Sequence, residues 1–197
     1  GVRYDSYQAT TLGRELSRFI TASAWAASSK LAVERGPFPE WEHSALKNRL
    51  PGPVRNSNVT TIAPTGTISI LAGCSSGIEP YYALASTRKA LWKSTGFSQL
   101  ILEYVPALRE ELEKNMTPYS AEVVLYELAY QPHRATEILT AHNIDPLKYR
   151  TAMDINPVWH VRHQAVWQSY VTNGVSKTIN LPNGATVGDV SDAFKAA

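Results

Sequence analysis

The clearest chemical pattern in the sequence is a run of seven residues with three hydroxyl side chains and a glycine: Ala63, Pro64, Thr65, Gly66, Thr67, Ile68 and Ser69. Gly66 lacks a side chain, so the backbone can approach a ligand closely. If a helix begins at Thr67, its first N–H groups and its dipole face the loop and favour an anion such as phosphate. Each hydroxyl could donate a further hydrogen bond, and hydrogen bonds to charged groups contribute about 1.5–3 kcal/mol. The run therefore predicts a phosphate-binding loop, with an ordinary capped Pro-Thr-Gly turn as the alternative.

Two reactive side chains follow this run, and each has an ordinary structural explanation as well. Glu79 could act as a general base, whereas a carboxylate beside a turn is more often solvated or hydrogen-bonded locally. Cys74 could act as a nucleophile, although a lone cysteine after an apolar run is more typically a small buried side chain. Cys74 is the only cysteine among the 197 residues, so this sequence can form neither an internal disulfide nor a thiolate metal cage.

A second group of polar residues, later in the sequence, is compatible with metal binding. His160 and His163 lie one helical turn apart and close to Asp154, but a third ligand would have to come from elsewhere. The alternative, which we favour for His160, is a hydrogen bond to a backbone carbonyl in the core. Lys177 lies in a predicted strand, where its ammonium either reaches solvent or meets a charged ligand.

The composition argues against two classes of partner. A net charge of +2, with 19 basic residues scattered along the chain, argues against nucleic acid. The longest apolar run, residues 68–73, is far shorter than the roughly 20 residues of a membrane-spanning helix, which argues against a membrane. The sequence opens on no signal-peptide pattern, so a cytoplasmic protein is the expectation.

The most secure element is a long helix that begins near residue 6 and ends at Gly36 and Pro37. Either Asp5 or Ser6 is expected to cap its first turn. Apolar residues at helical spacings predict one buried face, made of Leu12, Leu16, Phe19, Ile20, Ala27 and Leu31.

The remaining elements mix helices with a few strands. Residues 59–62 and 175–182 predict two strands, and Thr186 with Asp189 predicts a capping box for a last helix. Further helices are predicted at residues 67–71 (with a strand as the alternative), 97–115 with a break at Pro106, 121–130, 135–142 and 157–173. The order of elements predicts an α/β chain with non-adjacent strands.

Five segments carry a family resemblance when they are read together: residues 3–6, 31–39, 55–69, 75–80 and 176–182. The second reads Leu-Ala-Val-Glu-Arg-Gly-Pro-Phe-Pro, the fourth Ser-Ser-Gly-Ile-Glu-Pro and the last Ser-Lys-Thr-Ile-Asn-Leu-Pro. In this order they closely resemble the large chain of ribonucleotide reductase, specifically its adenosylcobalamin-dependent class. The combination is highly specific, while residues 90–150 carry little of the family's signature.

This resemblance implies a fold and a reaction. The family folds as a ten-stranded α/β barrel, so residues 1–197 are expected to form a helix-rich, C-terminal portion of that single catalytic domain, incomplete at both ends. In the family, the loop matching residues 63–69 holds the substrate's phosphates through backbone amides and hydroxyls. The reaction replaces the ribose 2′-OH by hydrogen through thiyl-radical chemistry, with adenosylcobalamin as cofactor and a cysteine pair as electron source.

The sequence departs from the family's pattern mainly in its cysteines. Cys74 matches neither the radical cysteine nor the reducing cysteines, so no catalytic residue and no metal ligand is assigned to this chain. His163 stands where the family usually has Met, and Asn173-Gly174 where Asp-Asn is usual. We therefore expect an enzyme of the ribonucleoside-diphosphate reductase type whose isolated chain is inactive. The resemblance implies as partners a ribonucleoside di- or triphosphate, the remainder of the barrel, a thioredoxin-type reductant and a second copy in a homodimer.

Three alternatives stay open from the sequence. The chain could be a stand-alone nucleotide- or phosphate-binding module, or a split subunit, without catalysis of its own. It could be a docking subunit that uses residues 36–57 and 97–150 as partner surface. Within the enzyme interpretation, a metal-radical class I large chain is the alternative to the cobalamin class, because the barrel is shared.

Overall fold

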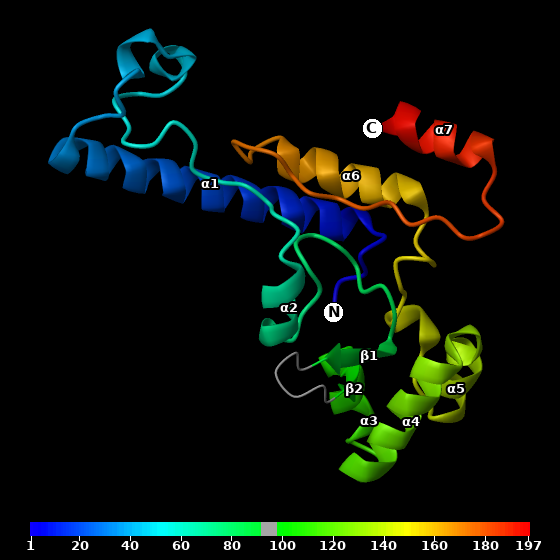
Figure 1. Ribbon diagram of the computed structural model, residues 1–197. Helices are drawn as coiled ribbons and strands as arrows, with labels where there is room; N and C mark the ends of the chain where they lie inside the picture. The colour runs from blue at the N-terminus through cyan, green and yellow to red at the C-terminus, as the bar shows by residue number, and fades with distance from the viewer. Residues whose placement is uncertain (92–97) are drawn as a thin grey trace. The chain divides into compact units, whose positions relative to one another are not determined.

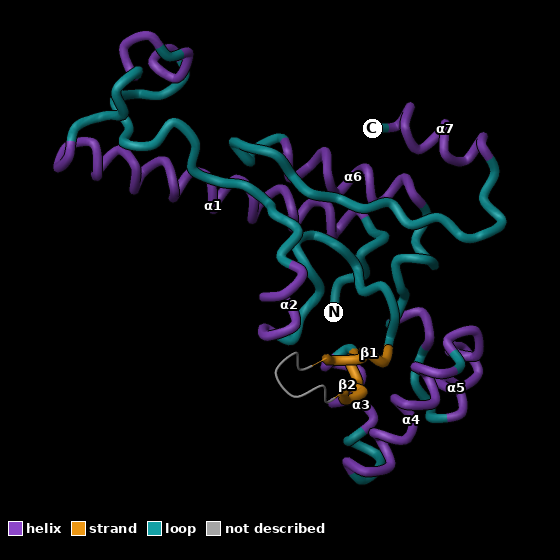
Figure 2. Tube along the Cα trace, in the orientation of Figure 1, coloured by secondary structure: helices purple, strands orange, loops and turns teal. Residues whose placement is uncertain are grey.

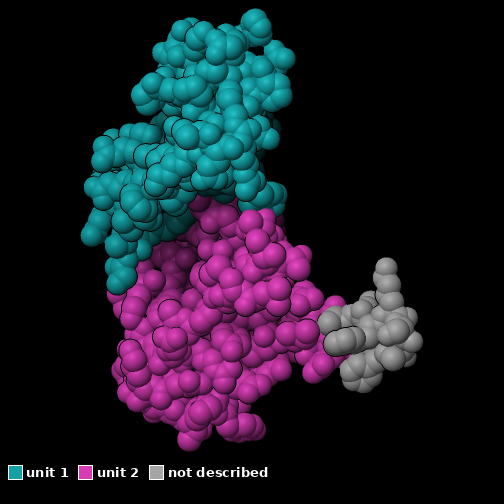
Figure 3. Space-filling model, turned by 90° about the vertical axis from the view of Figure 1, so that its left-hand side faces the viewer, with its two compact units in different colours: residues 1–64, 157–178, 185–197 teal, residues 65–156, 179–184 magenta. Residues whose placement is uncertain are grey.

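The computed structural model describes residues 1–91 and 98–197, which form a helix-rich chain with few strands (Figures 1 and 2). The chain divides into two compact units, coloured separately in Figure 3. Unit 1 comprises residues 1–64, 157–178 and 185–197, and unit 2 comprises residues 65–156 and 179–184. No helix within the described ranges is long and apolar enough to cross a membrane.

Unit 1 is built around α1 (Tyr7–Arg35), the long helix that the sequence predicts. The Ser6 side chain caps it by accepting a hydrogen bond from the backbone N–H of Ala9 at 3.1 Å. Gly36 ends it with a φ of 77°, which residues with a Cβ rarely adopt. The structure therefore confirms both predicted ends of the helix and selects Ser6 over Asp5 as the cap.

Two more helices belong to unit 1. α6 (Pro157–Gln168) packs along α1, and the two helices lie side by side in Figures 1 and 2. α7 (Val187–Ala196) begins with the predicted capping box, in which Thr186 and Asp189 each accept a hydrogen bond from the other's backbone N–H. Two short 3-10 turns follow α1, η1 (Trp41–His43) and η2 (Ala45–Asn48).

The buried face of α1 differs from the predicted one. The residues that α1 buries are small or polar: Thr10, Gly13, Ser17, Thr21, Ser28 and Ala32. The four large apolar residues of the predicted face, Leu12, Leu16, Phe19 and Ile20, are 43–69% exposed, Ala27 is exposed and Leu31 is half-buried. The prediction was wrong because α6 packs on the side where the side chains are smallest. At Gly13 a Cβ would lie only 3.0 Å from the Trp167 ring nitrogen, so a larger residue would push α6 away.

Thr60 joins three segments of unit 1. Its Oγ1 lies 3.2 Å from Thr21 Oγ1 in α1 and accepts a hydrogen bond from the N–H of Thr172 at 3.1 Å. Its carbonyl accepts from Thr172 Oγ1 at 3.1 Å and from the N–H of Asn173 at 3.0 Å. Thr172 Oγ1 in turn accepts from the N–H groups of Val59 and Thr60, each at 3.0 Å. These bonds hold together two segments that are 112 residues apart in sequence.

The two predicted strands meet, but as a single parallel bridge rather than a ladder. Ile62 pairs with Val175 through two bonds, Ile62 N–H to Gly174 O at 3.1 Å and Ser176 N–H to Ile62 O at 2.8 Å. The N–H groups just before Ile62 bond to a threonine side chain instead of a neighbouring strand. The predicted strand at 175–182 is therefore reduced to its first residue.

Unit 2 contains a hairpin where the sequence predicts part of a helix. β1 (Ala85–Leu91) and β2 (Ser98–Tyr104) pair antiparallel, and they are the strands drawn in Figure 2. The prediction of one helix over 97–115 is wrong for the residues of β2, and its first residue, Phe97, lies outside the described ranges. A short apolar run fits either a helix or a strand, and here the pairing with β1 decides.

Helices make up most of the rest of unit 2. They are α2 (Gly66–Ala72), α3 (Pro106–Leu112), α4 (Pro118–Tyr130), α5 (Ala135–Ala141) and two 3-10 turns, η3 (Pro132–Arg134) and η4 (Pro146–Lys148). Pro106 begins α3 rather than kinking a longer helix, because the first helical turn does not need its missing N–H. The helices predicted at 67–71, 121–130 and 135–142 are confirmed within a few residues.

The core of unit 2 is a cluster of leucines on these helices. Five of them are at most 1% exposed: Leu108, Leu112, Leu125, Leu128 and Leu139. Leu84 and Val105, which flank the hairpin, belong to the same cluster. The hairpin, α3, α4 and α5 therefore share one core. These features agree with the predicted helix-rich chain with few strands, while the ten-stranded barrel stays a prediction.

Replacing Leu125 by alanine should lower the free energy of unfolding by about 2–5 kcal/mol, because it leaves a cavity in this leucine cluster. Urea denaturation followed by circular dichroism measures the change. Tyr119→Ala is the matched control on the same helix, since Tyr119 is 79% exposed and its loss should change stability by less than about 0.5 kcal/mol. Equal effects of the two substitutions would contradict the assigned core.

Candidate functional site

The predicted phosphate loop begins with a strained backbone turn. Thr65, the residue before α2, has φ 49° and ψ 28°, a left-handed conformation that is uncommon for a residue with a Cβ. Its Oγ1 accepts a hydrogen bond from the N–H of Gly77 at 2.8 Å. This bond ties the loop to residues 75–80, so the structure brings together two of the segments that carry the family resemblance.

The first amides of α2 are directed out of the helix. Ser69 donates the first intrahelical bond, from its N–H to the Thr65 carbonyl at 3.0 Å. The N–H groups of Gly66, Thr67 and Ile68 precede that bond, so the geometry of a helix start points them away from the helix body. All three residues are exposed. Together with the Thr67 hydroxyl, they present donors suited to an anion.

The three predicted hydroxyl donors do not have equivalent surroundings. Thr67 is exposed, and Thr65 accepts from Gly77 while its own proton stays available for donation. Ser69 is 8% exposed, and its Oγ donates to the Gly66 carbonyl at 3.1 Å. Its hydroxyl therefore supports the first turn of α2.

The first two residues of the run differ from the other five. Ala63 and Pro64 belong to unit 1 and are exposed, whereas residues 65–69 belong to unit 2. Neither side chain has a hydrogen-bond donor, and Pro64 has no backbone N–H. Among these two residues, only the backbone N–H of Ala63 could donate to an anion.

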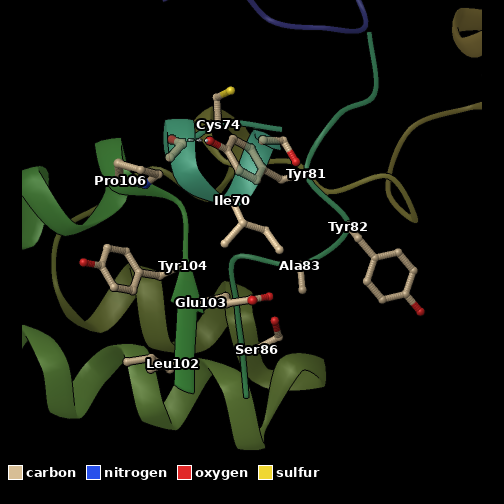
Figure 4. Close-up of a pocket in the computed structure, with 12 residues that line it drawn as sticks. Ile70, Cys74, Tyr81, Tyr82, Ala83, Ser86, Leu102, Glu103, Tyr104 and Pro106 are labelled. Atoms are coloured by element: carbon tan, nitrogen blue, oxygen red, sulfur yellow. Dashed lines mark hydrogen bonds between the residues drawn. The ribbon is translucent and has the colours of Figure 1, made fainter. Parts of the chain in front are cut away.

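A cavity of about 370 Å³ lies beside the C-terminal half of α2, within unit 2 (Figure 4). Residues from α2, the loop after it and the hairpin line it: Ser69, Ile70, Gly73, Cys74, Tyr81, Tyr82, Ala83, Ser86, Leu102, Glu103, Tyr104 and Pro106. Cys74 is exposed rather than buried, so the expectation of a small buried side chain was wrong. Tyr81 donates to the Gly73 carbonyl at 3.4 Å, and burial, followed by the Cys74 thiol, raises the pKa of its hydroxyl.

A larger cavity of about 1140 Å³ lies elsewhere in unit 2. Its walls come from β1, α4, α5 and residues 145–154. No residue of the predicted phosphate loop lines it. Two of its charged groups have local partners, since Asp154 accepts from the N–H and hydroxyl of Thr151 and Arg150 donates to the Asp154 carbonyl.

The two histidines of α6 are buried and engaged in unit 1. His163 Nε2 lies 2.9 Å from the Tyr4 carbonyl oxygen, which can only accept a hydrogen bond, so Nε2 carries the proton. The rings of His163 and Tyr4 stack with their centroids 4.0 Å apart. His160 is fully buried, and its Nδ1 lies 2.7 Å from Lys177 Nζ. The backbone-carbonyl bond predicted for His160 thus belongs to His163. Within the described ranges no group of three His, Cys, Asp or Glu could hold a metal ion.

Two contacts of these sites could not be read from the sequence pattern. The Gly77 N–H donates to Thr65, which is 12 residues away in the sequence. The only indication of this bond in the sequence is that the two motifs lie close together. For Lys177 the sequence analysis expected either solvent or a charged ligand. In the structure its ammonium donates to His160 Nδ1 at 2.7 Å and to the Thr178 carbonyl at 2.6 Å.

A family model described as "Ribonucleotide reductase, barrel domain" matches residues 1–52 and 49–197. A relative from Thermoplasma acidophilum, named vitamin B12-dependent ribonucleoside-diphosphate reductase, is 39% identical over 100% of this chain and 24% of its own length. A Mycobacterium tuberculosis protein of the same name is also 39% identical, over 100% of this chain and 27% of its own length. The chain thus spans about a quarter of the length of these curated relatives.

A solved structure supports the fold. The alpha subunit of the class Id ribonucleotide reductase of Actinobacillus ureae superposes with a TM-score of 0.71, over 99% of this chain and 34% of that one. The sequence identity is 21%, so this likeness shows the fold alone. The names of the curated relatives favour the cobalamin class over the class I alternative.

The stability of the chain should fall as the pH falls from 7 to 5, in part because of His163. Burial lowers the pKa of His163, the Tyr4 carbonyl opposes this shift and the charge of Lys177 adds to it. An unfolded histidine titrates near pH 6.5, so the unfolded state takes up a proton first and acid favours unfolding. In His163→Gln, urea unfolding at both pH values should show a smaller loss. His133→Gln, at an exposed histidine, should leave the loss unchanged; equal losses in all three proteins would contradict the assignment.

Proposed function

The chain belongs to the ribonucleotide reductase barrel-domain family, and from this we propose that it works as part of a vitamin B12-dependent enzyme that converts ribonucleotides to 2′-deoxyribonucleotides. The names of its curated relatives support both the cofactor class and a diphosphate substrate. Because the chain spans about a quarter of those proteins, the reaction is proposed for the complete polypeptide.

Within that enzyme, we propose that residues 63–69 bind the phosphates of the substrate. The observation that carries this is the turn at Thr65, which the Gly77 N–H holds at 2.8 Å just before the exposed amides of Gly66, Thr67 and Ile68. Consecutive amides at a helix start are a common phosphate cradle, because their partial positive charge is fixed before the ligand arrives. The loop needs no cation of its own for this.

The side chains of the loop divide the work. The exposed Thr67 hydroxyl donates to a phosphate oxygen, and Thr65 can donate while it accepts from Gly77. The buried Ser69 hydroxyl donates a hydrogen bond to the Gly66 carbonyl, which orients the first peptide of the cradle. Ala63 and Pro64 fix the path of the chain into the turn.

The described residues assign no contact to adenosylcobalamin. Its cobalt is already held by the four nitrogens of the corrin ring, so the lack of a three-residue metal cluster among the described residues does not bear on where it binds. No chemical event through the cofactor is assigned to this chain.

The electrons for the reaction must also come through other residues. Two thiols become a disulfide when a 2′-OH is reduced, and Cys74 is the only cysteine here. We propose that the rest of the polypeptide supplies that pair, and that a thioredoxin-type reductant regenerates it. A homodimer of the complete enzyme completes the proposed set of partners.

Thr67→Ala in the complete reductase should raise KM for the ribonucleotide about tenfold, which corresponds to about 1.4 kcal/mol and lies near the lower end for a hydrogen bond to a charged group. The value of kcat should change little, because the phosphate contact is the same in the ground and transition states. Steady-state kinetics measures both. Thr140→Ala, at an exposed threonine of α5, is the matched control. An unchanged KM in Thr67→Ala would reject the phosphate role of this hydroxyl.

Thr65→Val should also raise KM, whereas Thr65→Ser should stay close to the parent protein. Valine keeps the branched shape but removes the acceptor for the Gly77 N–H, while serine keeps it. A typical intramolecular hydrogen bond contributes about 0.5–1.5 kcal/mol, so KM should increase by roughly 2- to 12-fold. If both variants bind substrate equally well, the bond to Gly77 does not organise the loop.

A further inference from the structure

The sequence contains two pairs in which glycine follows asparagine, Asn173-Gly174 and Asn183-Gly184. Such pairs are prone to deamidation, because glycine has no Cβ that would hinder attack by its own backbone nitrogen. All four residues are exposed, so water reaches both pairs. The structure nevertheless holds the backbones of the two pairs very differently, and this difference decides which pair can react.

Deamidation requires that the peptide group between the two residues can rotate. The glycine nitrogen attacks Cγ of the asparagine and forms a C–N bond, which closes a five-membered succinimide ring. The bond from Cγ to Nδ2 breaks, and the amide nitrogen leaves as ammonia with the proton that the glycine nitrogen gives up. Water then opens the ring at either carbonyl and leaves aspartate or isoaspartate, with no change in oxidation state. Hydrogen bonds that fix the peptide group slow the attack, because they must open first.

The backbone of the first pair is held by hydrogen bonds on both sides of the reacting atoms. The Asn173 N–H donates to the Thr60 carbonyl at 3.0 Å, and the Asn173 carbonyl accepts from Gln168 Nε2 at 2.9 Å. The Gly174 carbonyl accepts from the N–H of Ile62 at 3.1 Å. Three consecutive peptide groups are therefore fixed, and the Gln168 bond fixes the one that contains the attacking nitrogen.

The second pair lies in a turn at a boundary between the two units. Gly184 ends a segment of unit 2, and Ala185 begins the last segment of unit 1. Within the part of the chain that the structure describes, neither Asn183 nor Gly184 makes a hydrogen bond through its backbone or side chain. A Cβ placed on Gly184 would meet no atom within 4 Å. The peptide group between these two residues is therefore free to rotate.

We propose that Asn183 is a site of spontaneous deamidation and that backbone hydrogen bonds protect Asn173 from the same reaction. Either product adds a negative charge to a chain whose formal net charge is +2. Isoaspartate also lengthens the main chain by a methylene group, in the turn that leads to the capping box of α7. The inference concerns the chemistry of the chain itself and does not depend on the proposed function.

Peptide mapping by mass spectrometry tests the proposal. The protein is incubated near neutral pH in heavy-oxygen water, which marks every asparagine converted during the incubation, and is then digested with trypsin. Cleavage after Arg162 and Lys177 places the two pairs on different peptides. In the folded protein Asn183 should be converted at least about tenfold faster than Asn173, because local opening must precede attack at Asn173. In concentrated urea the two should react at similar rates, because glycine follows both.

Two substitutions test the two halves of the proposal separately. Gln168→Glu keeps the side-chain length but removes the amide donor, so the rate at Asn173 should rise roughly 2- to 12-fold, the contribution of one hydrogen bond. Gln8→Glu, at an exposed glutamine of α1, is the matched control and should leave both rates unchanged. Gly184→Ala fits the open space and should nearly abolish conversion of Asn183, because the added Cβ hinders the attacking nitrogen.

Equal rates at Asn173 and Asn183 in the folded protein would overturn the proposal. A ratio of rates that is as large in urea as in the folded protein would do the same, because flanking sequence rather than hydrogen bonding would then decide. An unchanged rate at Asn173 in Gln168→Glu, with the circular dichroism of the parent protein, would reject the assigned protection. The ratio in the parent protein needs no substitution, so the test holds even if a variant fails to fold.

Discussion

The arrangement of unit 1 depends on the hydrogen bonds of Thr60. Through its hydroxyl and carbonyl this residue contacts Thr21 in α1 and the chain at Thr172 and Asn173. The Thr172 hydroxyl accepts hydrogen bonds from the backbone N–H groups of Val59 and Thr60, which in a β-sheet would donate to a neighbouring strand. Because hydrogen bonds are short-range and directional, they fix the position of the backbone at Thr60, shortly before Ala63 and Pro64. Side-chain hydrogen bonds of Thr60 and Thr172 therefore join two chain segments that a β-ladder would otherwise join.

The candidate phosphate loop owes its form to a similar device in unit 2. A left-handed threonine is costly by itself, and the Gly77 N–H stabilises it from a segment 12 residues away. The short helix that follows needs Ser69 to hold its first turn from inside. The exposed amides are therefore fixed by two hydroxyls that do not have to touch the ligand. In the proposed phosphate site, such preorganisation would keep the cost of binding low, because little backbone entropy would remain to be lost.

The long helix α1 packs through its smallest residues. Gly13 and Ser17 lie against Trp167 of α6, while Thr21 bonds to Thr60 and Ser28 to Asn56. The small side chains on this side allow close approach, and the large residues Leu12, Leu16, Phe19 and Ile20 stay exposed within unit 1.

The sequence by itself determined the elements that depend on neighbours along the chain, and its motifs pointed to the family that the comparisons then showed. A cap at Asp5 or Ser6 and the Thr186–Asp189 capping box act through local hydrogen bonds, and Gly36 acts through its own positive φ, so these helix ends could be predicted. The tertiary structure alone decided that residues 98–104 pair with β1 as a strand, that α1 buries its small face and that His163 rather than His160 bonds a carbonyl. Each of those outcomes depends on a partner far away in sequence, and local periodicity carries no information about which partner will arrive.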